Sequence, residues 1–227
     1  MYTLYIANRN YSSWSLRPWV LMRELRLPFT EQLLAFGDEP RWQEYRRLVT
    51  SAKVPGLIDG DTVVWDSLAN HEYLGERHAG VWPANGVARA WARSAAAEMH
   101  SGFTELRSRC AMSCGIRVRL REFPAALERD IGRLGALWTD GLRRFGGPFL
   151  AGDAFTAVDA FFAPIAFRVQ TYGLTLGHLG DTYASQLLQL ESMREWYVAA
   201  LAETTRDVPH EAEIRAMGTV TEDLRAQ

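Results

Sequence analysis

The stretch VPGLIDGDTVVWDS, Val54 to Ser67, decides how the first part of this chain folds. Two β-rich runs, Gly56 to Ile58 and Thr62 to Trp65, flank Asp-Gly-Asp, and Asp-Gly between apolar runs is a strong hairpin signal. Asp66-Ser67 then stands where a helix N-cap should lie. A proline removes a ladder donor, so Pro55 argues against an ordinary strand at this point, and one alternative is a cis Val54–Pro55 bond, a form that about 5–6% of X–Pro bonds in folded proteins adopt. Such a bond would leave Val54 free to pair with an extended peptide ligand.

The residues before this stretch predict alternating strands and helices. YTLYIA, residues 2–7, predicts a strand, and Trp19 to Leu25 predicts the start of a helix that ends by Pro28. Phe29 to Ala35 fits a second strand, and the polar segment 37–53 fits irregular chain with a short helix. The first 80 residues therefore have the order strand, helix, strand, irregular helix, hairpin, helix.

The remaining chain predicts helices alone, after a linker rich in Gly and Pro at residues 78–87. Apolar residues recur at helical spacing from Trp91 to Cys110, from Leu134 to Phe145 and from Leu187 to Leu201. Residues 157–167 are apolar almost all round, which predicts a central helix. The arginine-rich run Gly115 to Glu122 is interpreted as a solvated edge or loop.

Composition restricts the partners that this protein can have. The chain has 227 residues, of which 48% are hydrophobic, and a formal net charge of −2, so no global field draws it to nucleic acid or an anionic membrane. No apolar run approaches the roughly 18 residues that span a bilayer, and the N-terminus lacks the order of a signal peptide. Cys110 and Cys114 are four residues apart, which predicts one helix face rather than a disulfide scaffold. We therefore expect a soluble, cytoplasmic protein.

Two adjacent hydroxyls, Ser12 and Ser13, follow the first strand and precede the first helix. They should lie at the same carboxyl edge of the sheet as Val54 and as the helix that opens at Asp66-Ser67. The N-terminus of that second helix offers free N–H groups and a positive dipole end, which suit a carboxylate, while Asp66 could hold an ammonium group. An ordinary loop serine and an ordinary N-cap remain the structural alternatives.

This order of elements resembles the cytosolic glutathione S-transferases over nearly the whole chain. Four stretches carry the resemblance: YSSWSLRPW, AKVPGLIDGDTVVWDSLANHEYL, WPANGVARAWAR and FLAGDAFTAVDAFFAP. In the last, Thr156 and Asp159 look like the family's capping box, with Phe155 placed for the hydrophobic staple. The serine loop is most similar to serine-type, zeta-like bacterial members, although Trp14 stands at their cysteine and Asp66 stands where Glu or Gln is usual.

The resemblance implies an α/β domain followed by an all-α domain. Residues 1–80 would form a thioredoxin-like, glutathione-binding domain, and residues 88–227 an all-helical domain that contributes the electrophile pocket. The implied protein is a detoxification enzyme, a glutathione transferase that acts as a homodimer and uses glutathione as co-substrate, with no metal. The alternatives are a binding or regulatory protein without catalysis and a glutathione-dependent isomerase; a thiol-disulfide reductase is disfavoured because residues 1–80 contain no cysteine.

The resemblance also implies roles for particular residues. Ser12, with Ser13 as a close second, would donate a hydrogen bond to the glutathione thiolate. The tripeptide backbone would pair with Val54 beside a cis Pro55, and its γ-glutamyl end would meet Asp66 and Ser67. Lys53, the single lysine of the chain, would lie near the glycyl carboxylate. The substrate pocket would be walled by Trp14, Met99 and Phe103, with core packing as the competing explanation for the last two.

Overall fold

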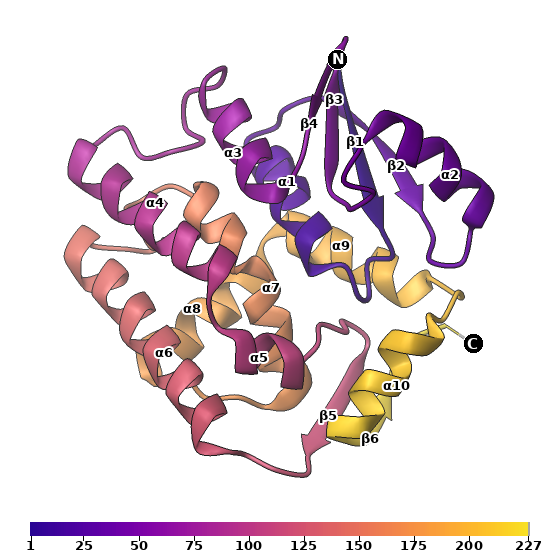
Figure 1. The fold of residues 1–227 in the computed structure, drawn as a ribbon. Coiled ribbons are helices and arrows are strands. Elements are labelled where there is room, and N and C mark those ends of the chain that lie inside the picture. Colours follow the sequence, from indigo (N-terminus) through magenta and orange to yellow (C-terminus); the bar gives the residue numbers. More distant parts are fainter. Residues whose placement is uncertain (227) are drawn as a thin grey trace.

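The computed structural model of the protein describes residues 1–226 and begins with an α/β unit (Figure 1). Its elements are β1 (Tyr2–Ala7), α1 (Ser13–Glu24), β2 (Phe29–Leu34), α2 (Glu39–Leu48), β3 (Gly56–Asp59), β4 (Thr62–Val64) and α3 (Ser67–Gly75). The four strands form one sheet in the order β2-β1-β3-β4. β1 pairs in parallel with β2, whereas β3 is antiparallel to both β1 and β4. This mixed sheet is a thioredoxin-like fold, as predicted.

The Asp-Gly hairpin and the helix after it form as the sequence predicted. Leu57 pairs with Val64 across the β3–β4 hairpin, and Gly60 takes the positive φ of 58° that the turn requires. The prediction for α1 was wrong at its start: the helix begins at Ser13, not Trp19, and contains Pro18. The first turn of α1 therefore carries Ser13 and Trp14, which brings these two residues into a helix N-terminus.

A C-terminal helical region follows the linker. It contains α4 (Gly86–Ser101), α5 (Thr104–Arg109), α6 (Ala125–Phe145), α7 (Ala157–Tyr172), α8 (His178–Gln189), α9 (Glu191–Ala202) and α10 (Val208–Met217). Two helices that the periodicity predicted as continuous are each broken in two. Phe103 takes a left-handed conformation, φ 55°, between α4 and α5, and Leu190 leaves the helical conformation, with ψ 142°, between α8 and α9.

One small sheet departs from the predicted all-helical region. β5 (Ile116–Leu120) pairs antiparallel with β6 (Gly218–Asp223) at the C-terminal end of the chain, and α10 was not predicted either. The arginine-rich run is therefore a strand, because its apolar residues Ile116 and Val118 point into the core while the arginines between them face outward. Cys110 ends α5 and Cys114 lies in the segment before β5, so the prediction that they share one helix face was wrong.

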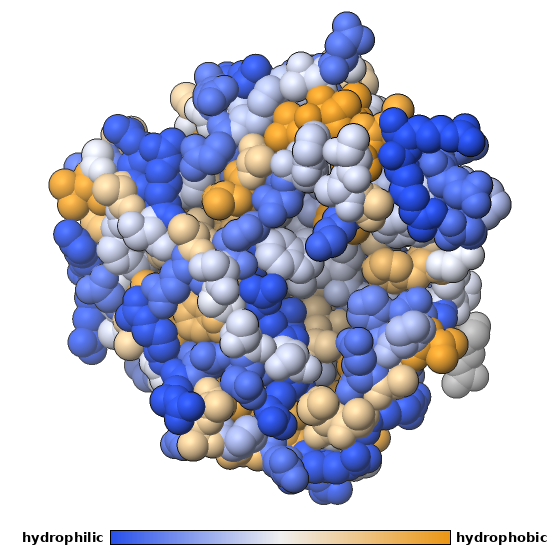
Figure 2. All heavy atoms as spheres, viewed as in Figure 1, coloured by the Kyte–Doolittle hydropathy of each residue, from blue (hydrophilic) through white to orange (hydrophobic). Residues whose placement is uncertain are grey.

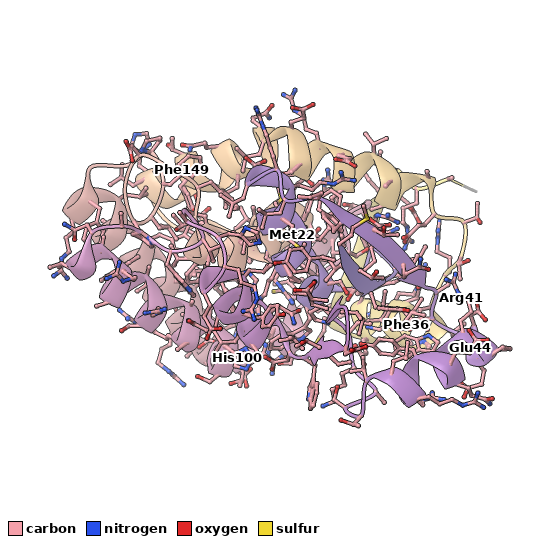
Figure 3. All side chains as sticks on the ribbon, turned by 90° about the horizontal axis from the view of Figure 1, so that it is seen from above. Met22, Phe36, Arg41, Glu44, His100 and Phe149 are labelled. Atoms are coloured by element: carbon pink, nitrogen blue, oxygen red, sulfur yellow. The ribbon has the colours of Figure 1, made fainter. Side chains whose placement is uncertain are left out.

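A continuous hydrophobic core joins the sheet to the helical region, with α7 at its centre (Figure 1). α1 packs against α7, and both helices are buried along most of their length. Viewed from above, Met22 of α1 lies in the middle of the molecule, and Arg41 and Glu44 of α2 lie at its outer end (Figure 3). This packing holds the start of α1 against the C-terminal helices. Within residues 1–226, no helix combines the length and apolar character that crossing a bilayer requires.

Candidate functional site

The serine loop separates its two hydroxyls into different environments. Ser12 is the N-cap of α1 and is buried, and its Oγ lies 2.7 Å from the Oγ of Ser15. Ser15 Oγ in turn accepts a hydrogen bond from the Ala7 amide at 3.1 Å, which fixes the end of β1 to α1. Ser13 is half-buried and lines an open cleft of about 480 Å³. The hydroxyl of Ser13 is therefore the one that faces the cleft.

The N-terminus of α1 carries backbone donors without acceptors. The Ser12 side chain makes no capping hydrogen bond, and within the described chain the N–H groups of Trp14 and Ser15 have no acceptor. Free N–H groups at a helix N-terminus bind anions, and the helix dipole adds to the attraction. A thiolate beside Ser13 would meet a hydroxyl and this positive helix end together.

The proline stretch leaves backbone groups free at the start of β3. The Val54–Pro55 bond is cis, as predicted. Val54 precedes the first paired residue of β3, Gly56, and its N–H and C=O bond to no group among residues 1–226. The side chain of Lys53 is exposed, and its carbonyl accepts a hydrogen bond from Tyr45 at 2.7 Å. The backbone at Val54 can therefore pair with an extended peptide.

The start of α3 also forms as predicted. Asp66 is the N-cap, and its Oδ1 accepts a hydrogen bond from the Leu68 amide at 3.0 Å. The same carboxylate is 49% exposed and lies 3.3 Å from Nε2 of His100. Ser67 is fully buried, and its hydroxyl accepts from Nη1 of Arg17 at 3.4 Å. These residues place one exposed carboxylate and one buried hydroxyl at a positive helix end.

Arg17 is a site residue to which the sequence assigned no role. Its guanidinium lies over the rings of Trp14, at 4.2 Å, and Phe161, at 4.8 Å, and within the described chain it forms no ion pair. Burial, together with Arg107 and Arg168, lowers the pKa of Arg17 to about 9, against the attraction of Asp66. A buried guanidinium without a carboxylate partner is costly, so this position favours a bound anion.

The wall of the cleft differs from the predicted one. Figure 2 shows the same face as Figure 1, hollowed near its centre between the sheet and α5 and α10. Trp14 does line the cleft, but Met99 and Phe103 are packed in the hydrophobic core, where helical periodicity directs apolar residues. Met112, an apolar residue that the sequence resemblance also places near the electrophile, lines the cleft. The other lining residues were not singled out from the sequence: Tyr11, Thr104, Arg107, Ser108, Ala111, Arg168, His210 and Glu213. A larger cavity, about 770 Å³, lies along α6 and contains none of the predicted site residues.

The fold and the site together define a class of protein: a thioredoxin-like domain with a free peptide-pairing edge and anion-binding helix ends, followed by a helical region that completes the cleft. Residues 11–77 match the family model described as the glutathione S-transferase N-terminal domain. The match spans the elements from α1 to α3.

Two solved structures of glutathione transferases and one of Ure2p have the same overall fold. A glutathione transferase homolog from Burkholderia gl BGR1, with bound glutathione, is 21% identical with a TM-score of 0.66, covering 88% of this chain and 97% of that one. Glutathione transferase Omega 3C from Trametes versicolor is 17% identical with a TM-score of 0.68, covering 95% and 90%. Ure2p in complex with glutathione is 18% identical with a TM-score of 0.63, covering 87% and 93%.

Proposed function

We propose that this protein is a glutathione transferase, which activates the thiol of reduced glutathione for attack on small electrophiles. The observation that carries the proposal is the start of α1, where the Ser13 hydroxyl opens to the cleft beside the acceptor-free N–H groups of Trp14 and Ser15. The free backbone of Val54 supports it, because a cysteinyl residue could pair there as an added strand.

The γ-glutamyl end of glutathione would bind at the start of α3. Its carboxylate would accept from Ser67 and the N–H groups of that helix, with Arg17 behind them, and its ammonium group would meet Asp66. Lys53 would lie near the glycyl carboxylate. These assignments give each charged group of the tripeptide an oppositely charged or hydrogen-bonding partner.

The chemical task is to ionise the thiol at neutral pH. A cysteine thiol has a pKa of about 8.5, and lowering it by about 1.5 units takes roughly 2 kcal/mol of preferential stabilisation of the anion. A hydroxyl donor and a helix N-terminus can supply this amount. The sequence resemblance favours Ser12 as this donor. In the structure, however, the Ser12 hydroxyl is buried and already bonds to Ser15, so the geometry favours Ser13. In either case the serine donates to the sulfur and is not itself a nucleophile.

The test compares Ser12→Ala and Ser13→Ala. We expect Ser13→Ala to lower kcat/KM with glutathione and an aryl chloride at least about tenfold, or about 1.4 kcal/mol of barrier. The ultraviolet absorbance of bound thiolate, titrated against pH, should shift to higher pH in the same variant. A wild-type protein that binds glutathione without ionising its thiol near pH 7 would instead be a binding or regulatory protein. If both variants match wild type, the serine assignment is wrong.

Three further features of the proposal rest on the sequence. The division into domains at residues 1–80 and 88–227 follows from the linker, the cytoplasmic location from composition, and the homodimer from the family resemblance. Sedimentation of the purified chain tests the homodimer. A glutathione-dependent isomerase stays an alternative, which an isomerisation assay with a cis-alkene substrate distinguishes from conjugation.

A further inference from the structure

Two arginines from distant parts of the chain line the cleft, and neither is paired with a carboxylate of the described residues. Arg107 lies on α5 and Arg168 on α7, and both line the cleft next to Ser13 and Trp14. Arg168 is 5% exposed; its Nη2 lies 3.5 Å from the Ser13 hydroxyl, and its Nε has no acceptor. Among residues 1–226, neither guanidinium forms an ion pair with Asp or Glu. The charge of Arg168 is thus buried and aimed at the cleft.

The groups that these arginines do contact are neutral. Arg168 Nη1 donates to the carbonyls of Cys110 and Arg107, the latter at 3.3 Å, at the C-terminal end of α5. Arg107 Nη1 donates to the carbonyls of His100 and Gly102, at 3.0 and 3.2 Å. Carbonyl oxygens accept hydrogen bonds from the guanidinium N–H groups, but they do not neutralise the positive charge of either arginine. Burial first, and then repulsion from Arg107, lowers the pKa of Arg168 to about 10, as expected for a cation without a counter-ion.

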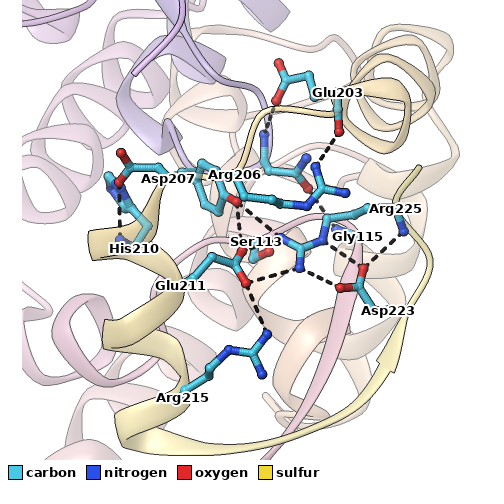
Figure 4. Close-up of polar contacts among 12 residues, drawn as sticks. Ser113, Gly115, Glu203, Arg206, Asp207, His210, Glu211, Arg215, Asp223 and Arg225 are labelled. Atoms are coloured by element: carbon cyan, nitrogen blue, oxygen red, sulfur yellow. Dashed lines mark hydrogen bonds and ion pairs between the residues drawn. The ribbon is translucent and has the colours of Figure 1, made fainter. Parts of the chain in front are cut away.

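Elsewhere in the molecule, a buried arginine with a structural role is paired with carboxylates. Arg225 is 6% exposed, and its guanidinium contacts the carboxylates of both Glu211 and Asp223 (Figure 4). The cleft arginines have no such partners within the described chain. Glu213 on α10 also lines the cleft, but its side chain is exposed and makes no ion pair with any described residue. The unpaired charge therefore suits an anion that arrives with a ligand.

We propose that the second substrate is an organic anion, a small electrophile whose carboxylate binds Arg168 and Arg107 while its reactive carbon faces Ser13. This inference rests on the proposed function and names the substrate class of the same cleft. The planar guanidinium fork of arginine matches a carboxylate in a two-point hydrogen bond. Arg107 Cζ lies over the ring of Trp14, 5.0 Å from the ring centroid. This ring offers an apolar wall for the rest of the substrate.

A pair of aryl chlorides tests the charge preference. 4-Chloro-3-nitrobenzoate and 4-chloro-3-nitrobenzamide differ in one carboxylate; in both, the glutathione sulfur bonds to the ring carbon and chloride leaves with the carbon–chlorine electron pair. Relative to the uncatalysed rates, we expect wild type to favour the benzoate by at least about tenfold in kcat/KM. Arg107→Gln and Arg168→Gln should each lower the benzoate value about tenfold and change the benzamide value less than about twofold.

A neighbour of Arg107 supplies the matched control. Arg109 lies on the same helix but pairs with Glu105 at 2.8 Å and does not line the cleft, so Arg109→Gln should leave both substrates unchanged. Arg168→Gln could fail to fold because Arg168 holds the end of α5. Arg107 is only half-buried, so Arg107→Gln should fold and still test the proposal in that case. The proposal would be overturned if wild type showed equal kcat/KM for the benzoate and the benzamide relative to their uncatalysed rates. It would also be overturned if Arg107→Gln lowered kcat/KM equally for both substrates.

Calorimetry separates this inference from the proposed function. Glutathione alone should bind wild type, Arg107→Gln and Arg168→Gln equally, while 4-chloro-3-nitrobenzoate alone should bind wild type more tightly than either variant. If glutathione fails to bind wild type but the benzoate result holds, the proposed function fails and the anion site stands. If glutathione binding is what the variants lose, the two arginines serve the tripeptide and the second-substrate proposal is wrong.

Discussion

A single buried histidine shows how strongly residue environments differ around this site. His71 of α3 is completely buried; its Nδ1 lies 2.6 Å from the Ser67 carbonyl, and its Nε2 has no partner in the described chain. The ring packs on Phe161, with centroids 4.7 Å apart, and burial lowers its pKa to about 3. His71 therefore stays neutral and holds the backbone of Ser67, which gives it a structural role beside the proposed ligand.

His71 should make the folded state sensitive to acid. Below its ordinary pKa of about 6.5 the unfolded chain takes up a proton that the folded chain does not, so stability falls by about 1.36 kcal/mol per pH unit. Between pH 7.5 and pH 5 this amounts to about 2 kcal/mol of unfolding free energy. The contribution of neutral His71 to the unfolding free energy is fully present above the pKa of about 6.5 in the unfolded chain, and it is lost as the pH falls towards the folded-state pKa of about 3. Urea unfolding at each pH measures it.

The control for this prediction is another histidine. His71→Gln should flatten the loss of stability between pH 6.5 and pH 5, whereas His178→Gln, an exposed change at the start of α8, should keep the wild-type slope. An unchanged slope in His71→Gln would show that other groups cause the acid sensitivity.

At the level of elements, the central helix α7 depends on the buried carboxylate at its start. Asp159 accepts hydrogen bonds from the amides of Leu150 and Thr156, both at 2.9 Å, and from the Tyr183 hydroxyl at 2.7 Å. These bonds complete the predicted capping box with Thr156 and also join α7 to α8 and to the loop before it. Because α7 packs against α1, this one carboxylate supports both sides of the cleft.

Asp159→Ala should therefore destabilise the protein strongly. Four buried donors, including the Thr156 hydroxyl at 3.2 Å, would lose their acceptor, and at about 1–3 kcal/mol for each unsatisfied group the expected loss is on the order of 4 kcal/mol. Asp38→Ala is the matched control, because Asp38 caps the peripheral helix α2 through one long bond, 3.4 Å, to the Arg41 amide. That variant should lose about 1 kcal/mol or less. Urea unfolding of both variants decides; equal losses would contradict this account of Asp159.

On the scale of the whole molecule, the end of the chain is tied to its beginning. The Tyr11 hydroxyl donates to Glu211 of α10 at 2.8 Å, and Nη1 of Arg225 donates to the same hydroxyl at 3.2 Å. Asn10 donates to the Ala200 carbonyl at 2.5 Å, and the Arg9 amide donates to Glu203 at 2.8 Å. The loop that carries Ser12 and Ser13 is thus held by residues almost two hundred positions away.

Cutting this connection should loosen the serine loop. Arg225→Met leaves Glu211 and Asp223 without their shared cation, and loss of one partner from a buried ion pair costs about 3–5 kcal/mol. Hydrogen exchange should speed up at the amides of residues 9–13 as well as in α10. Arg215→Met on α10 is the control: its side chain is 62% exposed and lies 3.6 Å from Glu211, so a loss below about 1 kcal/mol is expected. Unchanged exchange at residues 9–13 in Arg225→Met would show that the loop is held by other contacts.

The sequence by itself determined the local structure. The Asp-Gly hairpin, the helix start at Asp66 and the capping box of α7 each depend on a few adjacent residues, and all three form as predicted. The cis Val54–Pro55 bond also forms, but the family resemblance implied it, not the adjacent residues alone. Periodicity placed most helices, but it missed the break at Phe103 because a left-handed residue between two apolar segments leaves their spacing unchanged.

Only the tertiary structure decided which side chains meet at the cleft. Arg17, Arg107 and Arg168 lie on three different helices, and no local pattern marks them as neighbours or shows that each lacks a carboxylate. The family resemblance implied that Met99 and Phe103 wall a pocket, whereas the fold buries both in the core, the alternative that their helical spacing favoured. Local backbone geometry follows from residues close in sequence, whereas the charge and lining of a cleft depend on how distant helices pack.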